Sequence, residues 1–212
     1  MGRRVSCIYV LAGTNGSGKS SIGGATIRAL GADYFNPDEA ARRIRAANRG
    51  LSQMDANSAA WHEGRRLLER AIVERLDFAF ETTLGGNTIP GLLSKALEAG
   101  IEVRVWYAGL ATPELHIERV RARVARGGHA IPETDIRRRF DSGRLQLIRL
   151  LPKLTELRVY DNSADANPDD GVPPEPRLIL HMKRGRVVAR RSLRSTPDWA
   201  KPIIAAALGL QD

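Results

Sequence analysis

The sequence predicts an α/β fold built on a doubly wound, mainly parallel sheet. A short apolar run over residues 5–12 leads directly into a glycine-rich loop that opens a helix. Further apolar runs of strand length then alternate with amphipathic segments of helix length along the chain. Strands that alternate with helices favour a parallel sheet with the helices packed on it. Ligand-binding groups are then expected at the carboxyl ends of the strands.

The composition fits one globular domain with anionic partners. A chain of 212 residues suffices for one α/β domain, and its hydrophobic fraction of 42% and charged fraction of 27% are ordinary. Lys and Arg number 33 against 24 Asp and Glu, which gives a formal net charge of +9. This excess favours anionic partners but does not separate a small phosphorylated substrate from nucleic acid. The single cysteine, Cys7, cannot form an internal disulfide.

The sequence carries no signal for a membrane. It contains no run of about eighteen apolar residues, the length expected of a membrane-spanning helix. Its first apolar run leads straight into the glycine loop and has no cleavage site, so no signal peptide is predicted. We expect a cytoplasmic protein without a membrane partner.

The glycine loop over residues 13–20 fits the phosphate-binding pattern G-x-x-x-x-G-K-[ST], the P-loop. The strand before it and a predicted helix over residues 20–30, with Gly31 as its C-cap, supply the context that the pattern requires. Lys19 is expected on the β- and γ-phosphates, and the Ser20 hydroxyl on Mg²⁺. The sequence therefore predicts a P-loop NTPase that binds ATP or GTP with Mg²⁺. The expected nucleotide contacts are Gly13, Thr14, Asn15, Gly16, Ser17, Gly18, Lys19 and Ser20.

Capping signals define the next elements. Residues 33–35 are predicted as a short second strand, followed by Asn36 as N-cap and Pro37 at the first position of a helix that stops near Gly50. A second helix is expected over residues 55–75. Its apolar stripe is expected to hold Trp61, Leu68, Ile72 and Leu76.

The alternation of strands and helices continues to the end of the sheet. Strands are predicted over residues 78–83, 101–108 and 157–161, the last of these closing the main sheet, and helices over 89–99, 112–126 and 132–151. Residues 1–163 then form a P-loop kinase-like domain. Residues 164–176 are predicted as a loop or linker rich in Asp, Asn and Pro. Residues 177–212 are predicted as a small C-terminal β-hairpin, turning at 183–185, and a closing helix, both packed on the same domain.

Two acidic residues are expected at the rim of the sheet that carries the P-loop. Asp38 follows the second strand, where it can act as a general base toward a substrate hydroxyl or help to hold Mg²⁺, with Asn36 beside it as a substrate contact. Its alternative is a first-turn acid favoured by the helix dipole. Glu81 ends the third apolar run, where it and Thr83 can bind substrate. The alternative for Glu81 is a strand-terminal acid facing solvent.

A basic helix pair is predicted as a lid over about residues 119–139. Arg119, Arg123 and Arg126 are spaced at i, i+4 and i+7, so they share one helical face. That face leads into a glycine pair, His129 and three further arginines at 137–139. A lid of this kind can close over phosphates, and we expect about two of its arginines to touch them. Otherwise the arginines form a solvated charged face. His129 can contact the substrate, and its alternative is a structural residue at the glycine turn.

In these residues the chain resembles the zeta-toxin family of P-loop kinases, and most closely their chromosomal relatives labelled as predicted ATPases. The ordered set spans residues 5–163, and only the P-loop is specific when taken singly. Glu81-Thr82-Thr83 stands where the toxins carry Glu-Gly-Thr, and the spacing of the lid arginines differs as well. The matching stretches are residues 12–20, 35–39, 80–84, 123–129 with 131–132, and 160–163.

Zeta toxins phosphorylate a sugar hydroxyl of UDP-N-acetylglucosamine or related nucleotide sugars. The resemblance implies that Asp38 is the base, that Glu81 and Thr83 contact the substrate, and that lid arginines lie over the γ-phosphate. Arg119 resembles the first lid arginine of the family, and either Arg123 or Arg126 the second. A toxin role further implies a protein antitoxin as partner.

The sequence thus predicts an ATP- and Mg²⁺-dependent kinase that acts on a hydroxyl of a small anionic or nucleotide-linked substrate. Two alternatives stay open. The positive charge also suits a kinase or NTPase that acts on nucleic acid. A regulatory module, in which bound nucleotide only sets a conformation, would need the P-loop but no base.

Overall fold

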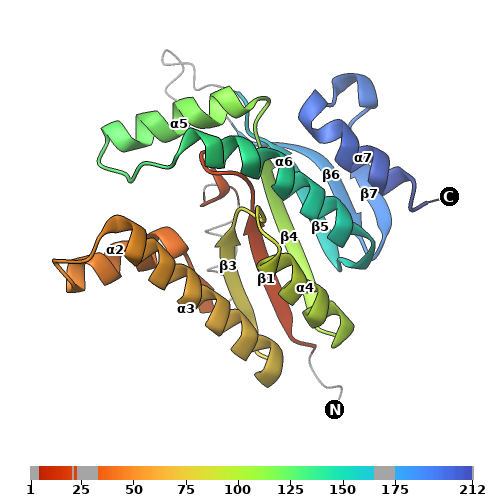
Figure 1. The fold of residues 1–212 in the computed structure, drawn as a ribbon. Helices are drawn as coiled ribbons and strands as arrows, with labels where there is room; N and C mark the ends of the chain where they lie inside the picture. The colour runs from red at the N-terminus through yellow and green to blue at the C-terminus, as the bar shows by residue number, and fades with distance from the viewer. Residues whose placement is uncertain (1–4, 21, 23–32, 165–174, 212) are drawn as a thin grey trace.

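Seven strands form one sheet, shown in Figure 1. In this computed structural model residues 5–20, 22, 33–164 and 175–211 are described. The strands are β1 (Cys7–Ala12), β2 (Asp33–Phe35), β3 (Phe78–Thr82), β4 (Glu102–Gly109), β5 (Glu156–Asp161), β6 (Arg177–Lys183) and β7 (Arg186–Arg190). Their order across the sheet is β2-β3-β1-β4-β5-β6-β7. β1 to β5 pair in parallel, and β6 and β7 pair antiparallel. The sheet is thus mainly parallel, and the predicted α/β P-loop fold is confirmed.

Two of the helices that connect the parallel strands begin at the predicted positions with a side-chain cap, and the helix expected over residues 55–75 begins earlier, at Gln53. Asn36 caps its helix by accepting hydrogen bonds from the backbone N–H groups of Asp38 and Glu39, at 2.9 and 3.1 Å. Thr112 caps a later helix by accepting from the N–H of Leu115 at 3.2 Å. The α-helices are α2 (Pro37–Ala47), α3 (Gln53–Glu74), α4 (Thr88–Glu98), α5 (Pro113–Ala125), α6 (Glu133–Leu150) and α7 (Lys201–Leu208), with 3-10 turns η1 (Leu151–Lys153), η2 (Leu193–Ser195) and η3 (Asp198–Ala200).

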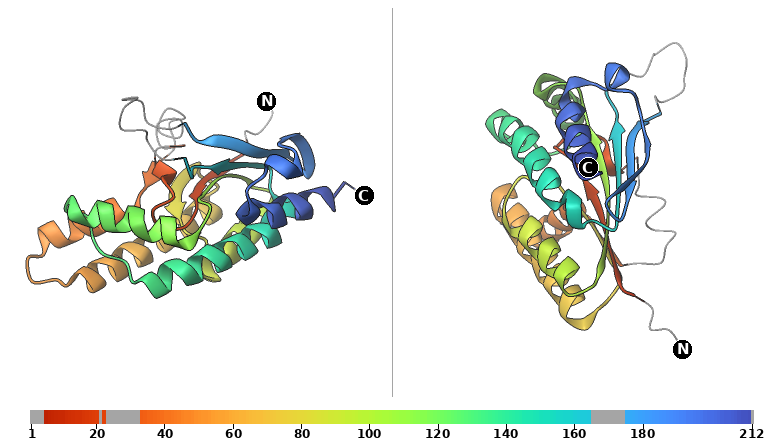
Figure 2. Two further views of the ribbon diagram at one scale, coloured as in Figure 1. Left: turned by 90° about the horizontal axis from the view of Figure 1, so that it is seen from above. Right: turned by 90° about the vertical axis from the view of Figure 1, so that its right-hand side faces the viewer.

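The main core lies between one face of the sheet and helices α3, α4, α6 and α7, which gather on one side of it (Figure 2). Val10, Val105 and Val159 of neighbouring strands are almost fully buried there. The opposite face carries a smaller buried cluster of Leu11, Ala79 and Trp106. Burial of both faces explains why the parallel strands read as continuous apolar runs in the sequence.

The predicted helix over residues 20–30 and most of the predicted linker lie outside the described residues. Trp61 was expected in the apolar stripe of α3 but is 41% exposed, because small residues such as Ala56 and Ala60 take the buried positions. Leu76, expected in the same stripe, lies beyond the end of α3 and is 39% exposed. β5 does not close the main sheet, because β6 of the C-terminal hairpin pairs with it and extends the sheet.

None of the described helices is long and apolar enough to cross a membrane.

Candidate active site

The P-loop connects β1 to the helical turn that contains Lys19 and Ser20. Its three glycines have positive φ angles, +138° at Gly13, +84° at Gly16 and +78° at Gly18, which side chains rarely adopt. A Cβ atom on Gly13 would lie 2.2 Å from the carbonyl oxygen of Ala108. The backbone N–H of Gly13 donates to the carbonyl of Thr82 in β3 at 3.2 Å. Glycine is therefore required by the backbone at the first position of the motif.

The loop has the features of a polyphosphate site. The Ser17 hydroxyl is buried and has no hydrogen-bond partner among the described residues. The loop therefore contains a polar group that a bound ligand can satisfy. Lys19 is partly buried, and desolvation lowers its pKa against the opposing effects of the Glu81 and Asp38 carboxylates. Ser20 is exposed and free to reach an ion beside the loop. These residues fit a nucleotide polyphosphate with its Mg²⁺.

Glu81 is fixed by residues of the neighbouring strand. Its side chain is 8% exposed, and its Oε1 accepts hydrogen bonds from the hydroxyl of Tyr34 and from Nδ2 of Asn36, the latter at 3.1 Å. The parallel pairing of β2 with β3 sets this contact, because Phe35 lies opposite Phe80. Thr83 lies two residues beyond Glu81, and its hydroxyl accepts from the N–H of Gly85 at 3.3 Å. The predicted substrate contacts Asn36 and Glu81 therefore touch one another.

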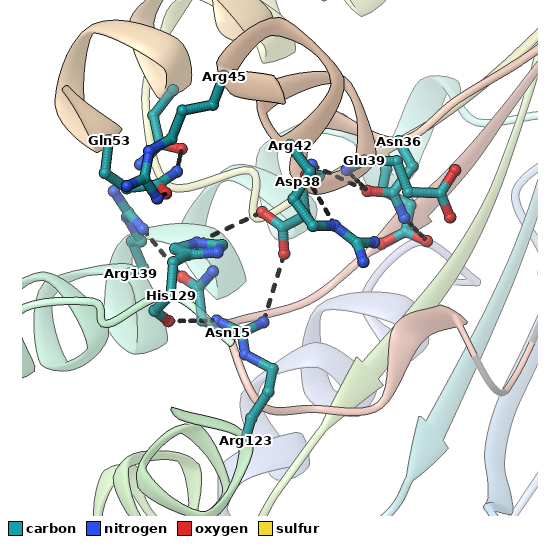
Figure 3. A network of polar contacts seen from close by, with 12 residues as sticks. Asn15, Asn36, Asp38, Glu39, Arg42, Arg45, Gln53, Arg123, His129 and Arg139 are labelled. Carbon is teal, nitrogen blue, oxygen red and sulfur yellow. Dashed lines mark hydrogen bonds and ion pairs between the residues drawn. The ribbon is translucent and has the colours of Figure 1, made fainter. Parts of the chain in front are cut away.

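Asp38 lies at the start of α2 and meets the lid (Figure 3). Its Oδ2 lies 3.3 Å from Nη1 of Arg123, and its Oδ1 lies 3.6 Å from Nε2 of His129. Nη2 of Arg123 also donates to the backbone carbonyl of His129 at 3.3 Å. The Nε–H of Arg123 is buried and has no hydrogen-bond partner among the described residues. An acid from α2 thus meets an arginine and a histidine from the lid, and 85 positions of the chain separate that acid from the arginine.

The other two predicted lid arginines lie apart from this contact. Nη2 of Arg119 donates to the carbonyl of Ala164 at 3.1 Å, and the Cβ of Arg119 lies beside Gly16, so Arg119 flanks the P-loop. Arg126 is exposed at the end of α5, and its Nε donates to the carbonyl of Ala122 in the preceding turn at 3.2 Å. Of the three arginines, the structure brings Arg123 to Asp38, Arg119 to the side of the loop, and Arg126 to neither.

Two residues at the loop were not singled out from the sequence. Nη1 of Arg139 in α6 donates to Oδ1 of Asn15 at 2.9 Å (Figure 3). Its Nη2 donates to Asp135 at 3.1 Å. The ring of His116 in α5 donates from Nδ1 to the backbone carbonyl of Asn15 at 2.9 Å, and burial lowers its pKa to about 4. A neutral histidine and an arginine from two helices thus hold the same P-loop residue. Arg139 lay within the noted arginine run, but nothing in the pattern distinguished His116.

The site offers Mg²⁺ few protein ligands. Within the described part of the chain, no three His, Cys, Asp or Glu side chains gather as a metal-binding group. P-loop proteins hold Mg²⁺ through the motif hydroxyl, one acid and the phosphates themselves. Ser20 and Asp38 are the residues of this chain with that chemistry at this rim.

Comparison with known proteins gives one family and several similar folds. The sequence model of the zeta toxin family matches residues 3–166. A Haemophilus influenzae protein recorded as uncharacterized is 35% identical over 132 residues, which make up 60% of this chain and 88% of that protein. A chain from the crystal structure of AvrRxo1-ORF1:-ORF2 with ATP matches 97% of this chain at 16% identity with a TM-score of 0.65, and this chain spans 64% of its length.

A second solved structure comes from the PezAT chromosomal toxin-antitoxin system of Streptococcus pneumoniae. It matches 76% of this chain and 69% of its own chain, at 14% identity and a TM-score of 0.51. At such identities the likeness shows the fold alone. The family model covers most of the chain, including the P-loop, Asp38, Glu81 and the lid. The chain therefore belongs to the zeta toxin family.

Proposed function

We propose that this protein is a Mg²⁺-dependent kinase that transfers the γ-phosphoryl group of ATP to a hydroxyl of a small anionic substrate. The observation that supports this most is the position of Asp38. A carboxylate stands 3.3 Å from a lid arginine at the same rim of the sheet as the P-loop. A site that only binds a nucleotide needs no base there, whereas transfer to a hydroxyl does.

Each residue has a role that follows from its position. The P-loop and Lys19 hold the phosphates, and Asp38 accepts the proton of the attacking hydroxyl. Arg123, whose Nε donor has no partner among the described residues, balances the charge that develops on the transferred group. Ser20 and Asp38 are the candidates to hold Mg²⁺, which when bound neutralises phosphate charge. Asn36, Glu81, Thr83 and His129 line the side on which the acceptor would bind.

The acceptor is proposed to be anionic or nucleotide-linked, such as a UDP-N-acetylglucosamine-like nucleotide sugar. The excess of 33 basic over 24 acidic residues supports an anionic acceptor. Membership of the zeta toxin family and the likeness to a chain of the PezAT system support a toxin role with an antitoxin partner. Such an enzyme would act in the cytoplasm, where ATP is available.

The test is transfer of labelled phosphate from γ-labelled ATP to a panel of acceptors. The panel holds UDP-sugars, free sugars, nucleosides and oligonucleotides, and the wild-type protein is compared with Lys19→Ala. We expect label on one small anionic acceptor and none with Lys19→Ala. Label on oligonucleotides, with binding that weakens steeply in salt, would favour the nucleic-acid-directed enzyme instead. Tight ATP binding without transfer to any acceptor would favour the regulatory module.

A further inference from the structure

The C-terminal segment, residues 175–211, lies beyond the part of the chain that the family model matches, residues 3–166. It is nevertheless built into the fold. β6 pairs with β5, and α7 packs against the same core as α6 (Figures 1 and 2). β5 ends at Asp161, at the same edge of the parallel sheet as the P-loop. The segment therefore has a direct structural route to the nucleotide site.

Trp199 of η3 is the point at which the segment meets that edge. The side chain is 3% exposed, and its Nε1 donates to Oδ1 of Asp161 at 3.2 Å, where Asp161 is also 3% exposed. The indole ring covers Gly109, since a Cβ there would lie 2.3 Å from the ring. Asp161 also accepts from Arg177 at 3.1 Å. The buried carboxylate at the end of β5 is thus held by Trp199 and Arg177 of the C-terminal segment, together with the hydroxyl of Ser163.

The next residue, Asn162, reaches the P-loop. Its backbone N–H donates to the carbonyl of Gly109 at 3.0 Å, and its Nδ2 donates to the carbonyl of Ser17 at 2.9 Å. A Cβ on Gly18 would lie 2.4 Å from the same Nδ2 atom. Asn162 therefore fixes the main chain of the loop between Gly16 and Gly18, both of which have positive φ.

A glycine-rich loop loses more conformational freedom on ordering than other segments. Its backbone N–H groups bind phosphate well only if they are held in place before the ligand arrives. We propose that Trp199 and Asn162 are positioning residues for the P-loop. Trp199 holds Asp161, Asp161 orients the neighbouring Asn162, and Asn162 holds the carbonyl of Ser17. The C-terminal segment thereby sets the affinity of the loop for a polyphosphate chain. This inference rests on the proposed nucleotide-binding function.

The test measures the affinity of two probes by calorimetry, ATP and inorganic tripolyphosphate, for Trp199→Phe, Asn162→Ala and the double variant. Phenylalanine keeps an aromatic ring over Gly109 but removes the Nε1 donor. We expect both probes to bind about tenfold more weakly to each single variant, the scale of one lost buried hydrogen bond. The loss in the double variant is expected to be smaller than the product of the single losses, because both act through one contact. Trp61→Phe, which changes an exposed tryptophan on α3, is the matched control and should bind as wild type.

Thermal unfolding of each variant is measured beside the affinities, so that binding is compared only where the protein is folded. Unchanged affinity for both probes in Asn162→Ala, with wild type binding and Lys19→Ala not binding, would overturn the inference. A loss for ATP without a loss for tripolyphosphate would also overturn it, because the contact would then act on the nucleoside and not on the loop. Failure of wild type to bind ATP would instead overturn the proposed function. If Trp199→Phe does not fold, Asn162→Ala alone decides the matter.

Discussion

Arg123 and Asp38 form an ion pair, with 3.3 Å between Nη1 and Oδ2, although 85 positions separate them in the chain. The pair joins the lid helix α5 to the first turn of α2, so the proposed base is held by the residue proposed to stabilise the transferred group. Because the buried Nε–H of Arg123 has no partner among the described residues, it can donate a hydrogen bond to an additional anionic group. The contact therefore places the proposed base directly beside the residue proposed to stabilise the transferred group.

Replacement of Arg123 by alanine is expected to reduce the transfer rate about 10³-fold, because a cation at the developing charge stabilises the transition state more than the ground state. ATP affinity should change much less. Arg121→Ala is the control, since Arg121 lies on the same helix but is exposed and pairs with Glu133. The rates are measured with labelled ATP and the identified acceptor. A rate within twofold of wild type in Arg123→Ala would remove Arg123 from the proposed mechanism.

Replacement of Glu81 by glutamine is expected to raise the KM for the acceptor about tenfold, with a smaller effect on kcat. The amide removes the charge that receives hydrogen bonds from Tyr34 and Asn36, and charged hydrogen bonds contribute more than neutral ones. Steady-state kinetics with varied acceptor measure this. Glu98→Gln is the control, because Glu98 lies on α4 and forms an exposed ion pair with Lys153. An unchanged KM in Glu81→Gln would leave Glu81 as a structural strand-terminal acid.

His116 predicts a pH dependence of stability. Burial lowers its pKa from 6.5 to about 4, so the unfolded chain binds a proton in this interval while the folded chain does not. Stability contributed by neutral His116 is therefore present above pH 6.5 and is lost as the pH falls from 6.5 toward 4. From pH 7 to pH 5 the free energy of unfolding should fall by about 2 kcal/mol on this account.

Denaturant unfolding at the two pH values checks this expectation. In His116→Asn an amide donor can replace Nδ1 but cannot titrate, so most of the fall should disappear. His62→Asn, on the exposed part of α3, should keep the wild-type slope. Equal slopes in wild type and His116→Asn would show that His116 is not the group responsible.

Two helical glycines should respond in opposite directions to alanine. A Cβ on Gly64 in α3 would lie 2.6 Å from the Phe35 ring, so Gly64→Ala is expected to destabilise the protein by about 1–3 kcal/mol through overpacking. A Cβ on Gly91 in α4 would meet nothing within 4 Å. Gly91→Ala should therefore stabilise the helix by about 0.5–1 kcal/mol. Denaturant melts compare the two, and a stabilised Gly64→Ala would contradict the close packing of α3 on β2.

Local signals in the sequence predict much of this fold. Apolar runs and capping residues such as Asn36 and Thr112 define elements by nearest-neighbour physics, so they are readable without tertiary contacts. Trp61 was misplaced because helical periodicity shows that a face exists but not how close the partner comes. Ala56 and Ala60 occupy the buried face of α3, and Trp61 lies beside that face at the surface. The sequence also does not predict that the hairpin pairs with β5, because the pattern of a hairpin does not indicate which further strand it joins.

The candidate site likewise has residues whose position the sequence predicts and residues that only tertiary packing brings there. The P-loop and Asp38 follow strands directly, so their common rim can be inferred from the order of elements. His116 and Arg139 reach Asn15 from helices more than a hundred residues later, and only packing brings them there. Which arginine meets Asp38 depends on the rotation of α5, and a shared helical face does not fix it. The roles of these residues stay predictions until variants are measured.

The most direct test of the account compares ATP affinity and phosphate transfer in Asp38→Asn. Asparagine keeps the shape of the side chain but cannot accept the proton, so transfer should fall about 10³-fold while the ATP dissociation constant stays within about twofold of wild type. Lys19→Ala, measured beside it, should lose both. Transfer at the wild-type rate in Asp38→Asn would contradict the central claim that this carboxylate is the base of a P-loop kinase.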